Sequence, residues 1–172
     1  VAFDLENGEI AGNKGTANIY QTAGSFTVRS NEPALGEYDN DTKLIGRGYY
    51  NLSGGSFMAC NNFQIGRYGY GEINQTGGSL TCSNWLSIAR YDNSQGLYNL
   101  NGGTLSQINS TCGLVVGEQG FGTLNVGGTG AADVNFLRLS QTAGSKSIVN
   151  LNEGGTIAAN YIYMSNATTN GA

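Results

Sequence analysis

The chain of 172 residues has no histidine, a single proline (Pro33) and only three cysteines. Histidine is the commonest side chain for proton transfer near neutral pH and a frequent zinc ligand, so its absence removes the usual routes to both. Cys60, Cys82 and Cys112 show no C-x-x-C spacing. Two interpretations stay open, namely free thiols or one disulfide with a spare thiol. We expect neither a metal site nor a cofactor.

Charge and long apolar runs are also scarce. Charged residues make up 12% of the chain, the formal net charge is -4 and the pI is about 4.6. A nucleic-acid-binding domain needs a basic face for the phosphates, so nucleic acid is excluded as a partner. No apolar run approaches the roughly 18 residues that a membrane span needs, so no membrane insertion is expected.

Glycine, in contrast, is abundant, with 28 residues against an ordinary share of about 7%. The glycines recur at fixed positions in three consecutive segments, 45–64, 65–87 and 88–107. Each segment opens with an aliphatic residue, a small residue and an arginine, and later carries a Gly-Gly-Ser/Thr-Leu/Phe signal. A repeat period in the twenties is typical of a solenoid or another repeat array.

An asparagine before the glycine pair marks each repeat. Its successive positions are 23, 25, 26 and 25 residues apart, at Asn51, Asn74, Asn99, Asn125 and Asn150. Stacked side-chain amides donate to one neighbour and accept from the other, so we predict a structural ladder along the solenoid. As members of this ladder, Asn51 and Asn74 are expected to be buried from modification.

Apolar residues at alternate positions predict strands with one buried face. The residues expected inside after the glycine pair are Phe26, Phe57, Leu80, Leu105 and Ile157. Those expected in a further strand are Ile65, Ile88, Val116, Leu139 and Met164, with Phe63, Leu86, Leu114, Leu137 and Ile162 two residues earlier. The prediction is an all-β fold, a right-handed parallel β-helix (β-solenoid) with about three short strands per coil and coils of roughly 23–27 residues. A β-propeller would need about 40 residues per blade.

The predicted organisation is a single domain over residues 1–172. Residues 1–10 alternate as a half-buried strand, and the acidic segment 31–44 is expected to be a loop directed away from the coil. The predicted divisions are an irregular first coil over 1–44, regular coils over 45–164 and a tail over 165–172.

The pattern IGRxGxGxxNQTGGSL, residues 65–80, resembles the glycine-rich repeats of bacterial surface and secreted β-solenoids. These repeats belong to autotransporter passenger domains and PEP-CTERM-sorted exoproteins. The resemblance extends over roughly residues 45–164, with a weaker copy at 10–30. It implies a secreted bacterial protein, extracellular or at the cell surface, that acts as a stalk, adhesin or matrix component.

One surface is a candidate for binding. The repeats place arginines in a column, Glu118 follows in the next repeat, and tyrosines such as Tyr49 stand beside the column. Forked hydrogen bonds and ring stacking suit a glycan. The alternative is that the arginines lie along the coil edge and pair with Glu72, Asp92 or Glu118. The candidate glycan-binding residues are Arg47, Arg67, Tyr68, Tyr70, Arg90 and Tyr91.

Two further expectations concern the surface chemistry. Among the N-x-S/T sequons, Asn109 and Asn166 are the candidate glycosylation sites. Polysaccharide lyases and hydrolases share the β-helix, but the one acidic cluster, Glu37, Asp39 and Asp41, lies in a single loop and matches no complete calcium loop. We therefore expect no catalytic residue and no enzyme activity, with a polysaccharide-processing β-helix as the third alternative.

The two ends suggest the leading functional hypothesis. No helix is expected to cap either end, and open strand edges pair readily with another chain. A heterologous contact that does not close gives a fibre. We therefore expect an extracellular structural subunit that assembles head-to-tail with copies of itself into a surface or matrix filament, and a glycan-binding adhesin is the alternative. The candidate contact residues are Val1, Phe3, Leu5, Ile162 and Met164.

Overall fold

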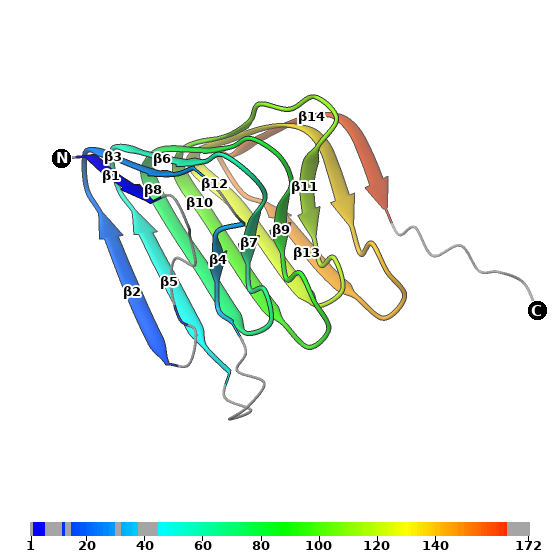
Figure 1. The fold of residues 1–172 in the computed structure, drawn as a ribbon. Coiled ribbons are helices and arrows are strands. Elements are labelled where there is room, and N and C mark those ends of the chain that lie inside the picture. The colour runs from blue at the N-terminus through cyan, green and yellow to red at the C-terminus, as the bar shows by residue number, and fades with distance from the viewer. Residues whose placement is uncertain (1, 6–11, 13–14, 30–31, 38–44, 165–172) are drawn as a thin grey trace, which may run out of the picture.

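The protein is a β-solenoid. The computed structural model describes residues 2–5, 12, 15–29, 32–37 and 45–164, with side chains from residue 12 onward. Within these ranges every element is a strand and every strand pairing is parallel. Figure 1 shows the coils side by side from the N-terminal to the C-terminal end. The predicted all-β fold with stacked parallel coils is therefore confirmed.

Three faces run along the solenoid axis. The first contains β2 (Thr16–Gln21), β5 (Arg47–Leu52), β13 (Lys146–Leu151) and the first parts of β8 (Tyr70–Cys82), β10 (Gln95–Gln107) and β12 (Phe121–Leu139). The second contains β1 (Ala2–Leu5), β3 (Ser25–Val28), β6 (Ser56–Ala59), the following parts of β8, β10 and β12, and the first part of β14 (Thr156–Met164). The third contains β4 (Ala34–Leu35), β7 (Phe63–Ile65), β9 (Leu86–Ile88), β11 (Gly113–Val116) and the last parts of β12 and β14.

The apolar columns expected from the sequence stack inside the coils. On the second face, Phe57 lies opposite Phe26 on one side and Leu80 on the other. On the third face, Ile65 lies opposite Ile88. These side chains belong to one continuous buried cluster that runs through the stacked coils. Removal of this apolar surface from water is the main contribution to stability.

The structure refines the expected coil in two places. The three strands of a coil are not always separate, because β8 and β10 continue through the glycine pair and β12 covers all three faces. The loop expected over 31–44 contains a strand, since Ala34 and Leu35 form β4 and are buried. Residues 38–44 of that segment and the tail 165–172 lie outside the described residues.

Glycine is required at the corners because neighbouring backbones approach closely there. Gly78 has a φ of 70°, and a Cβ at this position would lie 2.6 Å from the carbonyl oxygen of Gly55 in the preceding coil. Both the left-handed backbone and the close contact exclude larger side chains. The turn after the third face uses the same conformation, at Gly66 with a φ of 74° and at Ala89 with a φ of 64°.

The asparagines form a side-chain ladder on the outer side of the first face. Each Nδ2 donates to the Oδ1 of the preceding coil, from Asn74 to Asn51 at 3.4 Å, Asn99 to Asn74 at 2.8 Å, Asn125 to Asn99 at 2.7 Å and Asn150 to Asn125 at 2.7 Å. The ladder alternates along the strand with inward-facing residues such as Tyr50 and Leu52. Asn51 and Asn74 are therefore half-buried, and the amides of both take part in the ladder.

A second amide ladder lies at the corner before the third face. Asn84 Nδ2 donates to Asn61 Oδ1 at 2.9 Å, and Asn109 Nδ2 donates to Asn84 Oδ1 at 3.2 Å. Sequence reasoning missed this ladder because no glycine pair marks its members. In the last two described coils, Asn160 Nδ2 donates to Asn135 Oδ1 at 2.8 Å in the same way.

The last described coil leaves part of its interior side uncovered. Ile162 is 60% exposed and Met164 is 74% exposed, although Leu137, which precedes Ile162 in the same column, is 4% exposed. Among the described strands, β13 and β14 pair on one side only, with β12. At the other end, Phe3 and Leu5 lie in β1, whose side chains are not described, and Val1 lies outside the described residues.

Candidate functional site

The predicted Tyr/Arg face is divided between two places. Arg67 and Arg90 occupy equivalent positions after the third face, because the strands that precede them are in register. Glu37 takes that position one coil earlier and Glu118 one coil later, whereas Arg47 lies in β5 on the first face. The column predicted through Arg47 is therefore wrong, since its Ile-Gly-Arg triplet precedes a first-face strand and does not follow a third-face strand.

Both arginines of the column are occupied by carboxylates. Arg67 Nη1 lies 3.0 Å from Glu37 Oε1, and Arg90 Nη1 forms an ion pair with Glu118 Oε1. The hydrogen bond to Glu118 raises the pKa of Arg90. These pairs join adjacent coils at the solenoid corner, so the two guanidinium groups are largely used within the protein.

The tyrosines also contact one another. Tyr68 and Tyr91 stack with ring centroids 4.2 Å apart and planes inclined by 10°, so each ring covers one face of the other. Tyr70 lies on the first face with Tyr49, 5.7 Å away, and Arg47, whose Cζ lies 5.4 Å from the Tyr70 ring centroid. The six candidate residues therefore do not form one continuous binding face.

Of the two candidate glycosylation sites, the structure describes Asn109 but not Asn166. Asn109 is half-buried, and its Oδ1 accepts hydrogen bonds from the Thr111 backbone N at 2.9 Å and the Thr111 hydroxyl at 2.8 Å. Its Nδ2 donates to the second ladder, so the whole amide is engaged. Asn166 lies outside the described residues.

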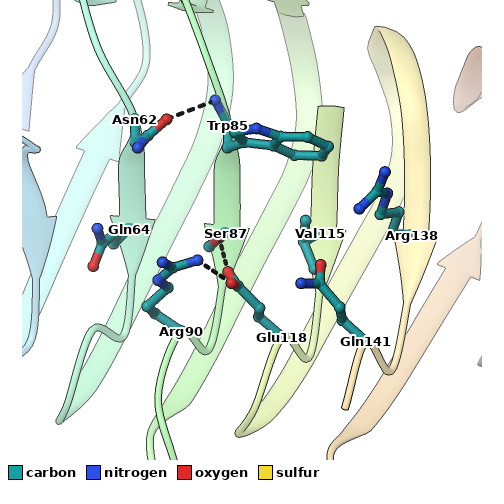
Figure 2. A pocket seen from close by; sticks show the side chains of 9 residues that line it. All are labelled: Asn62, Gln64, Trp85, Ser87, Arg90, Val115, Glu118, Arg138 and Gln141. Carbon is teal, nitrogen blue, oxygen red and sulfur yellow. Dashed lines mark hydrogen bonds and ion pairs between the residues drawn. The ribbon is translucent and has the colours of Figure 1, made fainter. Parts of the chain in front are cut away.

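A pocket on the outer side of the third face brings together residues from four successive coils (Figure 2). Its volume is about 310 Å³, at the lower end of the range of about 300–1,000 Å³ for small-molecule sites. Strands β7, β9, β11 and β12 form its base. It is lined by Asn62, Gln64, Trp85, Ser87, Arg90, Val115, Glu118, Arg138 and Gln141.

One wall of the pocket is aromatic. Trp85 precedes β9 and stacks with Phe136 of β12, with ring centroids 6.4 Å apart. The intervening coil carries Gly113, where a Cβ would lie 2.5 Å from Phe136 Cβ. Glycine at this position therefore lets Phe136 approach the intervening coil closely. Tyr161 continues the aromatic row, 5.2 Å from Phe136.

Arg138 is held against this wall by ring contacts. Its Cζ lies 4.7 Å from the Trp85 ring centroid and 5.5 Å from that of Tyr163. Cation–π contacts of this kind orient a guanidinium without using its N–H groups. Within the described part of the chain, Arg138 forms neither an ion pair nor a hydrogen bond with a side chain, and Figure 2 shows it at the pocket edge.

The base of the pocket contains an unsatisfied polar atom. Gln64 is 1% exposed, and its Oε1 has no hydrogen-bond partner. Its Nε2 donates to Glu32 Oε2, which fixes the direction of the amide. Buried acceptors without a partner are rare in native proteins, and each one calls for a physical explanation. Arg90 Nε is a second buried atom without a partner at the same pocket.

Glu118 is the one carboxylate in the pocket lining. It accepts hydrogen bonds from Arg90 and from the Ser87 hydroxyl, both within the pocket (Figure 2). Asn62 Oδ1 accepts from the Trp85 backbone N at 3.0 Å, which fixes the start of β9. The pocket therefore has a rigid border and a small number of polar groups that remain free.

Sequence reasoning missed Trp85, Gln64 and Arg138. The signal was present, because Gln64 and Arg138 lie between the inward-facing pairs of the third strand and must point outward. Reading that outward position in register across the coils gives Gln64, Ser87, Val115 and Arg138.

No protein-family model, no curated protein and no solved structure matches this chain. Within the described ranges, no helix is long and apolar enough to cross a bilayer. The same ranges contain no group of three or more His, Cys, Asp or Glu residues placed to hold a metal ion.

Proposed function

We propose that this chain is a non-catalytic, extracellular β-solenoid that binds a saccharide at the third-face pocket. The observation that carries the proposal is the combination of an aromatic wall at Trp85 with the unpartnered buried acceptor Gln64 Oε1. A sugar offers both an apolar C–H face and hydroxyl donors. The secreted bacterial setting follows the repeat resemblance at residues 65–80.

The lining supports binding more than bond cleavage. Glycoside hydrolysis uses two carboxyl groups on opposite sides of the scissile bond. Glu118 is a single carboxylate, and it is occupied by Arg90 and Ser87. Small-molecule sites typically combine apolar and aromatic walls with a few placed polar groups, which is the composition of this pocket.

The sequence provides a direct probe of the site, because Trp85 is the single tryptophan of the chain. Saccharides from a glycan array that retain the protein should change its tryptophan fluorescence in solution. Trp85→Ala should abolish retention on the array. The matched control is Tyr20→Ala, which removes an aromatic ring that is 75% exposed on the first face. Absence of retention by any glycan, or equal retention by the Trp85 variant, would reject the proposal.

End-to-end assembly with a second copy is the second candidate, favoured by the exposed interior residues Ile162 and Met164. The free edge of β13 has six residues, and β2 at the opposite end has six residues and pairs on one side among the described strands. Edges of this kind pair with further strands when nothing covers them. The β13–β14 end would then be covered by the N-terminal end of the next copy.

Sedimentation velocity over a concentration series tests this assembly. Species larger than the monomer should accumulate with concentration, and Ile162→Asp should suppress them because it places a charge on the contact. Ile108→Asp is the matched control, since Ile108 is 62% exposed but lies at a corner between the second and third faces. A monomer at every concentration would reject the assembly candidate.

A further inference from the structure

We propose that the third-face pocket selects a sugar that carries a carboxylate, such as a uronate unit, and that Arg138 is the residue that binds this carboxylate. The inference rests on the proposed saccharide-binding function and adds the chemical class of the ligand. It is carried by the charges in the pocket, the free groups of Arg138 and the acceptor at Gln64.

The charges of the lining leave one positive group uncompensated. Arg90 and Glu118 neutralise each other in an ion pair. Arg138 is the remaining charged residue of the lining, and its contacts are with aromatic rings. Glu32 accepts hydrogen bonds from Asn62 and Gln64 at the opposite edge of the pocket, so its carboxylate does not compensate Arg138. A carboxylate on the ligand would pair with Arg138, whereas a neutral sugar leaves Arg138 solvated.

The geometry of Arg138 suits a carboxylate. Guanidinium is planar and presents parallel N–H donors that match the two oxygens of a carboxylate. Trp85 and Tyr163 contact the guanidinium through their rings, with its Cζ 4.7 Å and 5.5 Å from their centroids, so the N–H edge stays available. Because these contacts restrict the side chain in advance, binding loses less conformational entropy.

The rest of the pocket selects for hydroxyl groups. Gln64 Oε1 is an acceptor without a partner, so it requires a donor from the ligand. A simple carboxylate such as acetate satisfies Arg138 but not Gln64. Gln64 and Arg138 lie three strands apart in the outward column, which is about 14 Å at the usual spacing between strands. One pyranose does not span that distance, so the carboxylate at Arg138 and the hydroxyl at Gln64 come from different units of a uronate oligosaccharide. The two requirements together define an acidic oligosaccharide.

Calorimetry with three ligands tests the inference. Trigalacturonate is compared with α-1,4-galactotriose, which has the same linkage and no carboxylates, and with free galacturonate. We expect trigalacturonate to bind at least tenfold more tightly than the neutral trisaccharide. Free galacturonate should bind at least tenfold more weakly than trigalacturonate, because one unit reaches Arg138 but not Gln64. Equal affinity of the monosaccharide and the trisaccharide would overturn the role of Gln64.

Three variants separate the role of Arg138 from general effects of charge. Arg138→Gln should lower the affinity for trigalacturonate at least tenfold and leave galactotriose binding unchanged. Arg138→Lys retains the positive charge but loses the paired N–H donors of the guanidinium. Its affinity for trigalacturonate should therefore lie between that of the unmodified protein and that of Arg138→Gln. Arg47→Gln is the matched control, because Arg47 also lies over a tyrosine ring, on the first face and outside the pocket.

Salt dependence of the unmodified protein gives a readout that needs no variant. Trigalacturonate affinity should fall as NaCl rises, and galactotriose affinity should not. Equal affinity for both trisaccharides, with no effect of Arg138→Gln, would overturn the carboxylate inference and leave saccharide binding in place. Failure of every saccharide to bind would overturn both proposals.

Discussion

The hydroxyl of Tyr98 donates a hydrogen bond to Gln75 Oε1 from the neighbouring coil, inside the solenoid core. The Gln75 Nε2 donates in turn to the carbonyl oxygens of Gly78 at 3.2 Å and Thr104 at 3.0 Å. The buried Gln75 amide therefore connects three parts of the core. It contacts the Tyr98 hydroxyl, the glycine corner at Gly78 in the same coil as Gln75, and the second-face strand at Thr104 in the coil of Tyr98. Tyr50 and Gln21 form an equivalent pair two coils earlier.

Replacing Gln75 with leucine should destabilise the protein, even though leucine occupies the neighbouring positions Leu52 and Leu100. The change leaves the buried Tyr98 hydroxyl without a partner, which costs about 1–3 kcal/mol. The double variant Gln75→Leu/Tyr98→Phe should recover part of this loss, because the orphaned hydroxyl is then absent. Urea unfolding of the four proteins in this cycle measures the coupling. Strictly additive losses would contradict the pairing.

The asparagine ladder predicts a difference between its middle and its end. Asn99 makes two ladder bonds and Asn150 makes one among the described residues. At about 0.5–1.5 kcal/mol for each net hydrogen bond, Asn99→Ala should cost about twice as much as Asn150→Ala. Chemical denaturation of both variants under the same conditions checks the ratio. Equal losses would mean that the ladder contributes little beyond the strand hydrogen bonds.

Ala89 offers a stabilising substitution. It has a φ of 64°, while the equivalent residues Gly66 and Gly117 are glycines with φ values of 74° and 66°. A left-handed conformation costs an L-residue roughly 1–2 kcal/mol, although glycine loses more entropy on folding. Ala89→Gly should therefore raise the melting temperature, which scanning calorimetry measures. Gly66→Ala should lower it, and the opposite order would contradict the proposed strain.

Three buried groups that can lose a proton, the thiol of Cys82 and the phenols of Tyr50 and Tyr98, predict a loss of stability at alkaline pH. Burial raises the pKa of the Cys82 thiol to about 12, and it also raises the pKa of the phenols of Tyr50 and Tyr98. In the unfolded chain these groups titrate near about 8.5 and 10. Above about pH 9 the unfolded state therefore binds fewer protons, and stability falls with rising pH until the folded groups also ionise. Urea unfolding at pH 7.5, 9.5 and 10.5 measures this decline, which should be smaller in Tyr98→Phe.

The repeat determines the parts of the fold that can be predicted from sequence. Inward columns such as Phe57–Leu80 follow from the period of two within strands and from the glycine corners. The position of Arg47 does not, because a three-residue likeness cannot fix register when turns differ in length. Only the interstrand hydrogen bonds decide which residue stacks on which. The result is that Glu37, not Arg47, precedes Arg67 in the corner column.

The pocket is harder to predict for a different reason. The alternation along the third strand shows that Gln64, Ser87, Val115 and Arg138 share one outward position, but their residue types differ from coil to coil, so no repeated motif marks the pocket. Trp85 stacks with Phe136 two coils away, and Gly113 of the coil between them has no room for a Cβ beside Phe136. A contact of this kind can be found only when the register between coils and the orientation of each side chain are known.

The asparagine ladders also give the solenoid a net dipole along its axis. From Asn74 to Asn150 on the first face, the amide nitrogen points to the preceding coil and the oxygen to the following one. Asn84 at the corner has the same direction, since it donates to Asn61 and accepts from Asn109. The amide dipoles therefore add along the axis, as peptide dipoles do in an α-helix. Asn150 ends the described row with its oxygen facing outward along the axis. Any coil that stacks on this side must present an N–H donor there, which asparagine provides and aspartate does not.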